Sequence, residues 1–209
     1  MIESLLPFVY AKSGYSFHFL GVHHRSIINR REININYTEY KMDFLELSRA
    51  RYSVLEYDGR PVEQELIDKI INAGIAAPTA CNNQPQRILI IDSDESRHKL
   101  NNVVPSKYYV PLAFLVCYNK LECWRRPMDG KSSGDIDASI VTTHMMMEAT
   151  ELGLGSIWVM YWDPTKMKTE FTLDDELEPV ALLIVGYKSE VSKPRQGHLT
   201  RKNRDAILL

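Results

Sequence analysis

The stretch Ala77-Pro78-Thr79-Ala80-Cys81-Asn82-Asn83-Gln84-Pro85 separates a segment of helical periodicity from a run of β-branched residues. Apolar residues recur at helical spacing before it, and Pro78 ends that helix. The run at 87–91 after it predicts a buried strand. Small and amide-bearing residues after a proline expose hydrogen-bond donors and acceptors. Such groups are needed to recognise the edge of a planar heterocycle. The alternative interpretation is a plain polar loop.

From Met42 onward, predicted helices alternate with predicted strands. Periodicity predicts a short helix that begins near Phe44 and runs into Arg51, and a longer one between Pro61 and Pro78. Further helices are predicted at 134–152 and 164–171, and strands at 87–91, 112–118, 156–161 and 179–186. The alternation indicates an α/β or α+β domain, and periodicity alone leaves the strand directions open.

The long predicted helix carries apolar residues that we assign to one side of it: Ile136, Ile140, Met145–Met147 and Leu152. Gly153 and Gly155 follow it, as is typical of a helix C-terminus. A dinucleotide-binding glycine loop instead follows a strand and opens a helix, so this pair does not fit one. Ser139 and His144 share a helix face poorly, and no Gly-x-Ser-x-Gly motif is present, so the sequence does not indicate hydrolytic catalysis.

Composition indicates a globular chain of one domain, since 44% of its 209 residues are hydrophobic and 25% are charged. The net charge of −2 offers no basic field to nucleic acid. No apolar run approaches the roughly 20 residues of a membrane span. The three cysteines lack Cys-x-x-Cys spacing, which argues against a disulfide framework and a zinc site. We expect each to be small and partly buried, in a reducing cytoplasm.

Residues 1–41 lack sustained periodicity and differ in character from the rest. We expect them to be an appendage of unknown role, with the compact domain at 42–209. The dipeptide His23-His24 has no carboxylate or cysteine partner at ligand spacing, so no metal site is predicted.

Two further segments carry polar groups suited to an anion. Arg51 and Ser53 stand two residues apart and can offer a guanidinium fork and a hydroxyl to one anionic group. Basic residues also gather in the tail after the last predicted strand, at Arg195, Arg201, Lys202 and Arg204. Taken singly, a solvated helix end and a solvated charge run explain these features equally well.

Taken in order, the motifs resemble those of the nitroreductase family. That family's first pattern, Arg-x-Ser-Val, then Pro-Val, then Ala-Pro-Ser/Thr-x-x-Asn-x-Gln-Pro, is matched by Arg51–Val54, Pro61-Val62, Ala77–Thr79, Asn82 and Gln84-Pro85. Its later helix and closing segments are matched by Asp137–Ile140, Met145–Ala149, Gly153–Gly155, Trp158-Val159, Asp163-Pro164, Val185–Tyr187 and Arg201-Lys202. Each motif is weak singly, but the ordered set over 42–209 is specific.

The resemblance implies an α+β, three-layer fold with a central mixed or antiparallel sheet flanked by helices. It also implies a homodimer with FMN at the subunit interface, and the Met145–Met147 cluster on the buried interface face. The alternative is that these methionines fill the core of a single subunit.

The implied cofactor site has three parts. Arg51, Tyr52 and Ser53 hold the phosphate and ribityl chain, and Arg201 and Lys202 close on the phosphate. Five residues meet the flavin from the neighbouring subunit or edge: Pro78, Thr79, Ala80, Asn82 and Gln84. The backbone at Val159 and Met160 approaches the reactive side of the ring.

The implied activity is FMN-dependent transfer of electrons from NADH or NADPH, through flavin N5, to a small acceptor such as a nitroaromatic or quinone. No protein nucleophile or general base is expected. Two alternatives stay open: a more specialised flavin reaction such as reductive dehalogenation, and a flavin-binding carrier or sensor with little turnover.

Two positions depart from the family pattern. Leu55 stands where the family often has a cation facing N1 and O2 of the flavin, so we expect a lower reduction potential. Met160 stands where the family commonly has glycine, so a side chain there narrows the substrate slot or shifts the backbone.

Overall fold

The computed structural model of the chain describes residues 42–104 and 110–209. The expected N-terminal extension, with His23-His24, lies outside the described residues. The helices are α1 (Phe44–Ala50), α2 (Gln64–Ile75), α3 (Asp94–Val103), α4 (Gly134–Glu151) and α5 (Pro164–Glu170), and the strands are β1 (Gln86–Ile91), β2 (Leu112–Asn119), β3 (Gly155–Val159) and β4 (Leu177–Gly186). Short 3-10 turns occur at Ala80–Asn82, Gln196–Leu199 and Arg204–Ala206. Among the described helices, none is both long and apolar enough to cross a membrane.

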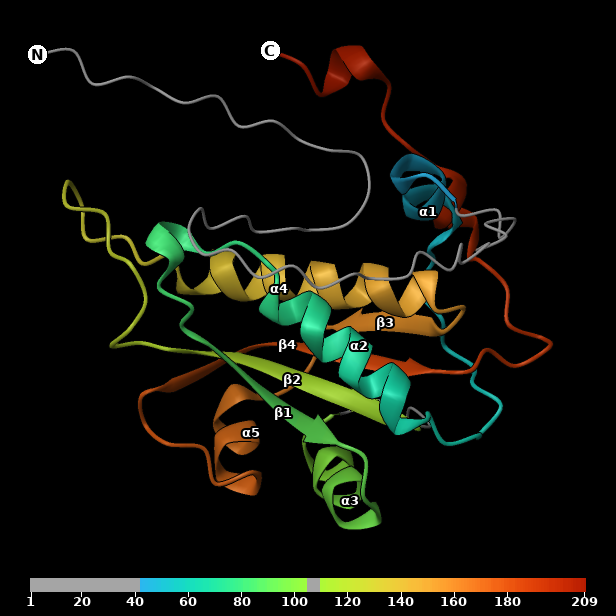
Figure 1. Ribbon diagram of the computed structural model, residues 1–209, viewed down its shortest axis with the longest axis horizontal. Coiled ribbons are helices and arrows are strands. Elements are labelled where there is room, and N and C mark those ends of the chain that lie inside the picture. The colour runs from blue at the N-terminus through green and yellow to red at the C-terminus, as the bar shows by residue number, and fades with distance from the viewer. Residues whose placement is uncertain (1–41, 105–109) are drawn as a thin grey trace, which may run out of the picture. The chain divides into compact units, whose positions relative to one another are not determined.

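The four strands form one antiparallel sheet in the order β1-β2-β4-β3. Helices α2 and α4 cover one face, and α3 and α5 cover the other (Figure 1). The α+β prediction is therefore confirmed, and the sheet is the antiparallel one of the two kinds expected. The prediction that 87–91 is buried was wrong: β1 is an edge strand, and of its six residues only Ile91 is fully buried.

Side chains of the central strands alternate between two apolar cores, one on each face of the sheet. Phe114 and Leu183 belong to the core under α2 and α4. Leu115 and Ile184 belong to the core under α3 and α5. All four are completely buried, because β2 and β4 have a strand on each side and helices on both faces.

Helix α3 is not among the helices predicted from the sequence. Its residues are mostly polar, and of its side chains only Leu100 and Val103 are buried, so apolar periodicity is weak. The start signal is nevertheless present: the Ser93 side chain accepts from the Ser96 backbone N–H, and the Ser96 side chain accepts from the Ser93 N–H. Capping chemistry was the feature that could have found this helix.

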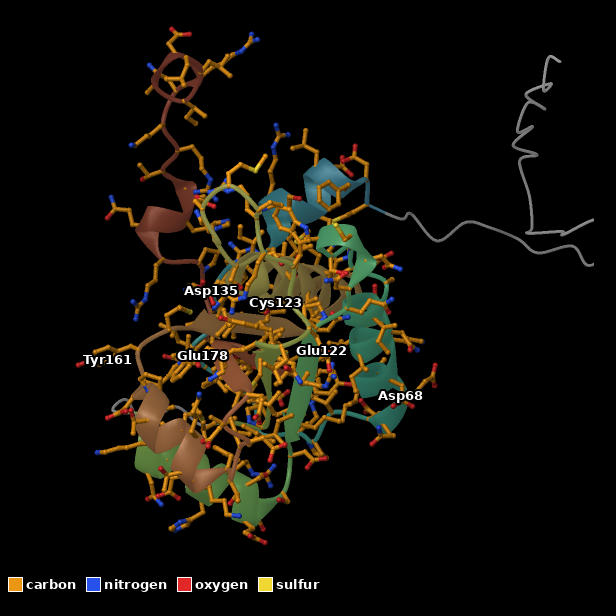
Figure 2. The ribbon with its side chains drawn as sticks, turned by 90° about the vertical axis from the view of Figure 1, so that its left-hand side faces the viewer. Asp68, Glu122, Cys123, Asp135, Tyr161 and Glu178 are labelled. Atoms are coloured by element: carbon orange, nitrogen blue, oxygen red, sulfur yellow. The ribbon has the colours of Figure 1, made fainter. Side chains whose placement is uncertain are left out.

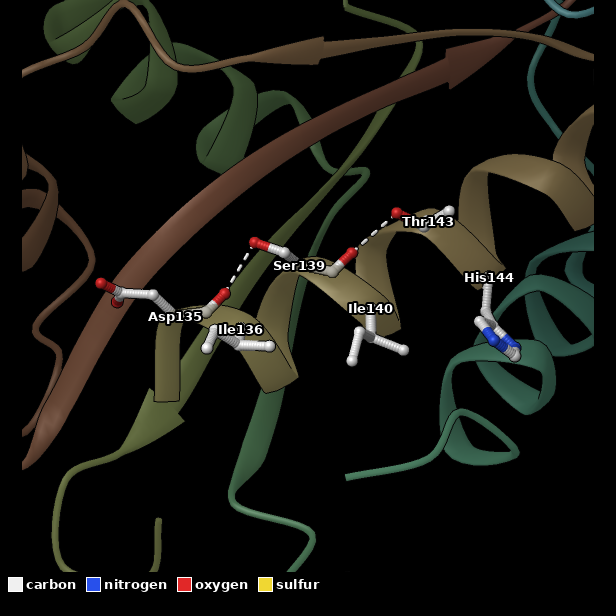
Figure 3. Close-up of a pocket in the computed structure, with 6 residues that line it drawn as sticks. All are labelled: Asp135, Ile136, Ser139, Ile140, Thr143 and His144. Atoms are coloured by element: carbon white, nitrogen blue, oxygen red, sulfur yellow. Dashed lines mark hydrogen bonds between the residues drawn. The ribbon is translucent and has the colours of Figure 1, made fainter. Parts of the chain in front are cut away.

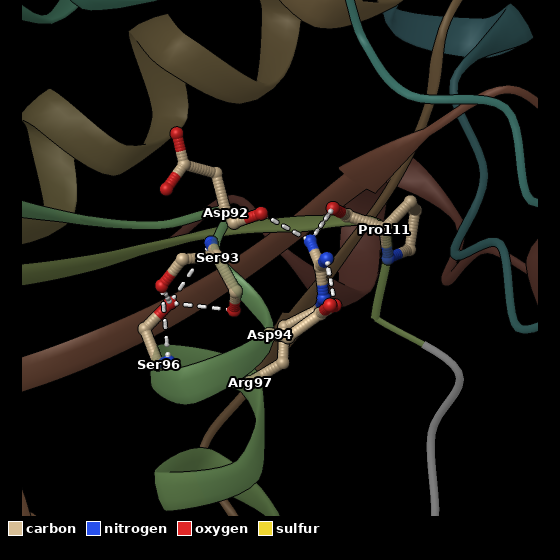
Figure 4. A network of polar contacts seen from close by, with 6 residues as sticks. All are labelled: Asp92, Ser93, Asp94, Ser96, Arg97 and Pro111. Atoms are coloured by element: carbon tan, nitrogen blue, oxygen red, sulfur yellow. Dashed lines mark hydrogen bonds and ion pairs between the residues drawn. The ribbon is translucent and has the colours of Figure 1, made fainter.

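Arg97 of α3 ties the end of β1 to the segment entering β2 (Figure 4). Its guanidinium donates to the Asp92 carbonyl and to the Pro111 carbonyl at 3.0 Å, and pairs with Asp94 at 2.7 Å. We expect Arg97→Ala to lower the free energy of unfolding by about 1–3 kcal/mol, because it removes the donor to two carbonyl groups. Urea unfolding measures this change.

The matched control for Arg97→Ala is Lys99→Ala on the same helix. Lys99 forms an exposed ion pair with Glu95 at 2.9 Å, and such pairs contribute about 0–1 kcal/mol. Equal effects of the two substitutions would show that Arg97 acts only as a surface charge.

Candidate functional site

The first predicted site residues, Arg51–Ser53, follow helix α1 and lie at the β3 edge of the sheet. A capping box at Asp43 begins the helix, and Arg51 leaves it in an extended conformation. The chain then lies beside β3, where the Val54 N–H donates to the Ser156 carbonyl at 2.9 Å and Ser53 pairs with Ser156 in parallel. Gly155 permits this approach, because a Cβ there would stand 2.7 Å from Cγ2 of Val54.

The C-terminal tail folds back onto this group. The His198 ring meets the Tyr52 ring edge-on at 6.2 Å, and its Nε2 lies 3.2 Å from the Arg49 carbonyl. The Tyr52 hydroxyl lies 3.3 Å from Ser192 Oγ. These contacts bring Arg201, expected from the sequence, close to Arg51.

Burial and the neighbouring Arg201 guanidinium together lower the pKa of Arg51. Arg201 also donates to the carbonyls of His198 and Thr200, which hold its side chain in place. Two guanidinium groups held close together repel each other, and a bound anion relieves that repulsion. Ser53, which is exposed, follows Arg51 by two residues and carries a hydroxyl that can donate to an anion. Lys202 is exposed and follows Arg201 directly.

The second group of predicted residues forms a tightly bonded loop before β1. Thr79 Oγ1 accepts from the Gln84 N–H at 3.0 Å, and Gln84 Nε2 donates to the Asn82 carbonyl at 3.3 Å. The Ala80 N–H donates to Oδ1 of Asp137 at 2.9 Å, which ties the loop to the first turns of α4. Asp137 is not among the site residues predicted from the sequence. A carboxylate among buried helix positions was the available signal.

This loop is strained. Cys81, Asn82 and Gln84 have φ angles of 51°, 55° and 51°, a left-handed conformation that costs about 1–2 kcal/mol per non-glycine residue. All residues from Cys81 to Gln84 are exposed. Strain of this kind persists where the surroundings enforce it, and it clusters at ligand sites.

We expect Cys81→Gly to raise the free energy of unfolding by up to about 1 kcal/mol, because glycine adopts positive φ without strain. Asn83→Gly is the comparison: Asn83 has a right-handed φ of −70° and its Nδ2 donates to the Glu122 carbonyl at 3.0 Å, so glycine there lowers stability by about 1–2 kcal/mol. Thermal unfolding of the two variants gives opposite signs if the loop conformation is strained. A destabilised Cys81→Gly would contradict this.

The cysteines differ from one another. Burial raises the pKa of the Cys117 thiol to about 12, and Cys123 is also buried. Both match the expected small apolar residues. The expectation was wrong for Cys81, which is exposed because the left-handed turn directs it outward.

The third predicted position is the end of β3. The strand stops at Val159, two residues earlier than predicted, because Trp162 Nε1 donates to the Val159 carbonyl at 3.0 Å and closes a turn. Met160 and Tyr161 project from this turn with exposed fractions of 63% and 72%. Figure 2 shows Tyr161 at the margin of the domain, on the side that also carries Asp135 at the start of α4.

One chain therefore brings some predicted residues together and keeps others apart. Arg51, Tyr52 and Ser53 lie at the start of β3, with Arg201 near Arg51, and Val159–Met160 stand at the end of that strand, roughly 13 Å along. The loop at 78–84 is bound near the start of α4, whereas β3 follows the other end of this helix. The 18 residues of α4 place its ends about 27 Å apart.

The outward side of α4 is a shallow hollow of about 470 Å³, lined by Asp135, Ile136, Ser139, Ile140, Thr143 and His144 (Figure 3). The prediction that the apolar residues of α4 share one side of the helix was partly wrong. Met145 is completely buried against α2 and belongs to the subunit's own core, whereas Ile136 is 53% exposed on the opposite side. Apolar residues thus occur on both sides of α4, as in helices that are covered all round.

The comparisons agree with this architecture. The model of the nitroreductase family matches residues 48–110 and 113–187. A nitroreductase family protein from Clostridium difficile has a crystal structure with 44% sequence identity and a TM-score of 0.76, covering 80% of this chain and 98% of that one.

Two further proteins are similar over most of their length. A Methanothermobacter thermautotrophicus protein, provisionally named an NADH dehydrogenase/NAD(P)H nitroreductase, is 29% identical over 72% of this chain and 80% of its own. A protein from Exiguobacterium sibiricum, solved in complex with FMN, shares the fold at 19% identity and a TM-score of 0.69, covering 80% of this chain and 96% of that one.

Proposed function

The chain belongs to the nitroreductase family, and from this premise we propose that it is an FMN-dependent oxidoreductase that uses NADH or NADPH. The observation that carries the proposal is the pair of guanidinium groups, Arg51 and Arg201, held together beside Ser53 at the start of β3. Such a pair suits the FMN phosphate, to which arginine binds in a bidentate manner. We assign the ribityl chain to the same group, with Tyr52 and Lys202 beside it.

The ring of the flavin is assigned to the far end of β3. Backbone at Val159 and Met160 lies there, and the Trp162 indole fixes the turn. When bound, FMN supplies hydride acceptance from NAD(P)H at N5 and delivery to a small acceptor such as a nitroaromatic or quinone. The chain itself binds and orients the ring, and the exposed Met160 limits access to it.

The loop at 78–84 is assigned to the flavin of a partner subunit. It is tied to the start of α4, while Arg51 and Ser53, which we assign to the phosphate, lie beyond the other end of that helix. The assignment to the partner's flavin follows the family resemblance. A homodimer that covers the outward side of α4 brings the two groups together. The FMN sites implied by the family resemblance then form at the subunit interface. We propose no nucleic-acid or membrane partner and a cytoplasmic location.

The test is anaerobic addition of NADH or NADPH to the purified protein, with mass spectrometry of the released cofactor. FMN in the mass spectrum and bleaching of the flavin absorption band are expected. Protein without FMN would overturn the proposal. Screening acceptors against the reduced protein separates a nitro or quinone reductase from a specialised reaction such as dehalogenation.

A flavin carrier or sensor with little turnover is the second candidate, because Leu55 puts an apolar side chain where the family often has a cation. FMN that is bound but not bleached by either nucleotide favours this candidate.

We expect Leu55→Lys to raise the flavin reduction potential on the order of 30 mV, which corresponds to about 1.4 kcal/mol for two electrons. A nearby cation stabilises the negative charge of reduced flavin, so the sign is positive. Spectroelectrochemistry measures the potential, and Leu55→Met is the neutral control. A lysine variant whose reduction potential equals that of the methionine variant would contradict this prediction.

A further inference from the structure

We propose that Asp137 is a positioning residue that sets the conformation of the 79–84 loop and thereby its contact with the flavin. The inference rests on the proposed function. Asp137 itself touches the loop backbone and not the cofactor.

Asp137 is a buried carboxylate with only 1% of its surface exposed. It lies on the inward side of α4, directly before the completely buried Ala138. An apolar residue would fill such a position without the penalty of burying a charge. The carboxylate therefore points to a task that an apolar side chain cannot perform.

Both carboxylate oxygens have a defined partner. Oδ1 accepts from the Ala80 N–H at 2.9 Å, and Oδ2 accepts from the Ser133 hydroxyl at 2.6 Å. Ser133 precedes α4, so this second bond fixes the carboxyl group against its own helix. The first bond then connects a rigid helix to the loop, 57 residues away in sequence.

The Ala80 bond fixes the first peptide of the strained turn. With that N–H directed at Asp137, the Thr79 carbonyl accepts from the Asn82 N–H at 3.0 Å, and the left-handed residues follow. Asn82 and Gln84 then stand exposed on the outer side of the loop. Asp137 thus fixes the loop backbone that carries Asn82 and Gln84, the two amide side chains that we assign to the flavin edge.

Three variants test the role by FMN titration of the apoprotein. Asp137→Leu keeps the volume but accepts no hydrogen bond, so we expect FMN affinity to fall about 10-fold or more and exchange of the Ala80 amide to accelerate. Asp137→Asn retains an acceptor for Ala80, so affinity is expected to stay within about 3-fold. Thr142→Val is the matched control, with unchanged affinity expected, because it removes a buried hydroxyl that donates to the Ala138 carbonyl on the same helix and leaves the Ala80 bond in place.

The outcomes distinguish the inference from the proposed function. If the unaltered protein binds no FMN, both fall. If it binds FMN and Asp137→Leu, folded by circular dichroism, binds equally well, the positioning role alone falls. Should Asp137→Leu not fold, Asp137→Ser replaces it, since the shorter side chain leaves the Ala80 N–H without its acceptor. Unchanged FMN affinity in a folded Asp137→Ser would likewise overturn the inference.

Discussion

Arg51→Ala is expected to weaken FMN binding by about 10- to 100-fold, because a hydrogen bond to a charged group contributes about 1.5–3 kcal/mol. The same substitution is expected to leave the free energy of unfolding of the apoprotein unchanged or higher. Without the anion, Arg51 is half-buried beside the like charge of Arg201, and both factors lower its pKa. Removing it relieves repulsion in the apoprotein and removes the grip on the phosphate in the complex. Isothermal titration and urea unfolding measure the two effects.

A substitution that weakens FMN binding without lowering the stability of the apoprotein identifies an anion site. A structural arginine would lose stability on truncation, as Arg97 is expected to do. Lys99→Ala removes one positive charge from α3, on the other face of the sheet, and controls for the general electrostatic attraction of FMN. A fall in apoprotein stability with unchanged FMN affinity would contradict the phosphate assignment.

Arg201 offers a further check on the same site. If Arg51 and Arg201 bind one phosphate, the effects of Arg51→Ala and Arg201→Ala on FMN affinity are not additive. Additive losses would indicate that the two side chains act on separate groups.

Much of the fold could be predicted from local pattern. The elements with long apolar runs, β2 and β4, and the helices with clear stop signals, α2 and α4, lie within a few residues of their predicted bounds. Gly153 has the positive φ of 81° that its position after α4 indicated. Where pattern was weak, prediction failed. Polar α3 was missed, and the apolar run of β1 could not reveal that it lies at a sheet edge.

The candidate site was predictable in its parts and not in its assembly. Arg51 and Ser53 were identified from their spacing, but the approach of Arg201 to Arg51 depends on a tail that folds back through His198. The strain at Cys81–Gln84 depends on Asp137, which is 57 residues from Ala80. Long-range contacts of this kind leave no local signal. For α4, apolar residues all round gave no basis for telling the core side from the outward side.

Thr143→Arg tests whether the outward side of α4 is the dimer interface, and a large effect on dimer stability is expected. Thr143 is exposed, lines the hollow there, and donates to the Ser139 carbonyl at 2.8 Å. If a twofold dimer covers this side, the substitution buries an unpaired charge, and symmetry introduces it twice. Each such charge costs several kcal/mol, so we expect the dimer to dissociate at least about 100-fold more readily.

Thr169→Arg is the matched control. Thr169 is also an exposed helical threonine that donates to the carbonyl four residues earlier, at 3.0 Å, but it lies on α5, on the opposite face of the sheet. We expect Thr169→Arg to remain dimeric and loaded with FMN. Thr143→Arg should be a folded monomer by light scattering, with weak FMN binding, because the 78–84 loop of a partner no longer reaches the ring. A dimeric, fully loaded Thr143→Arg would place the interface elsewhere and, with it, the source of half the flavin site.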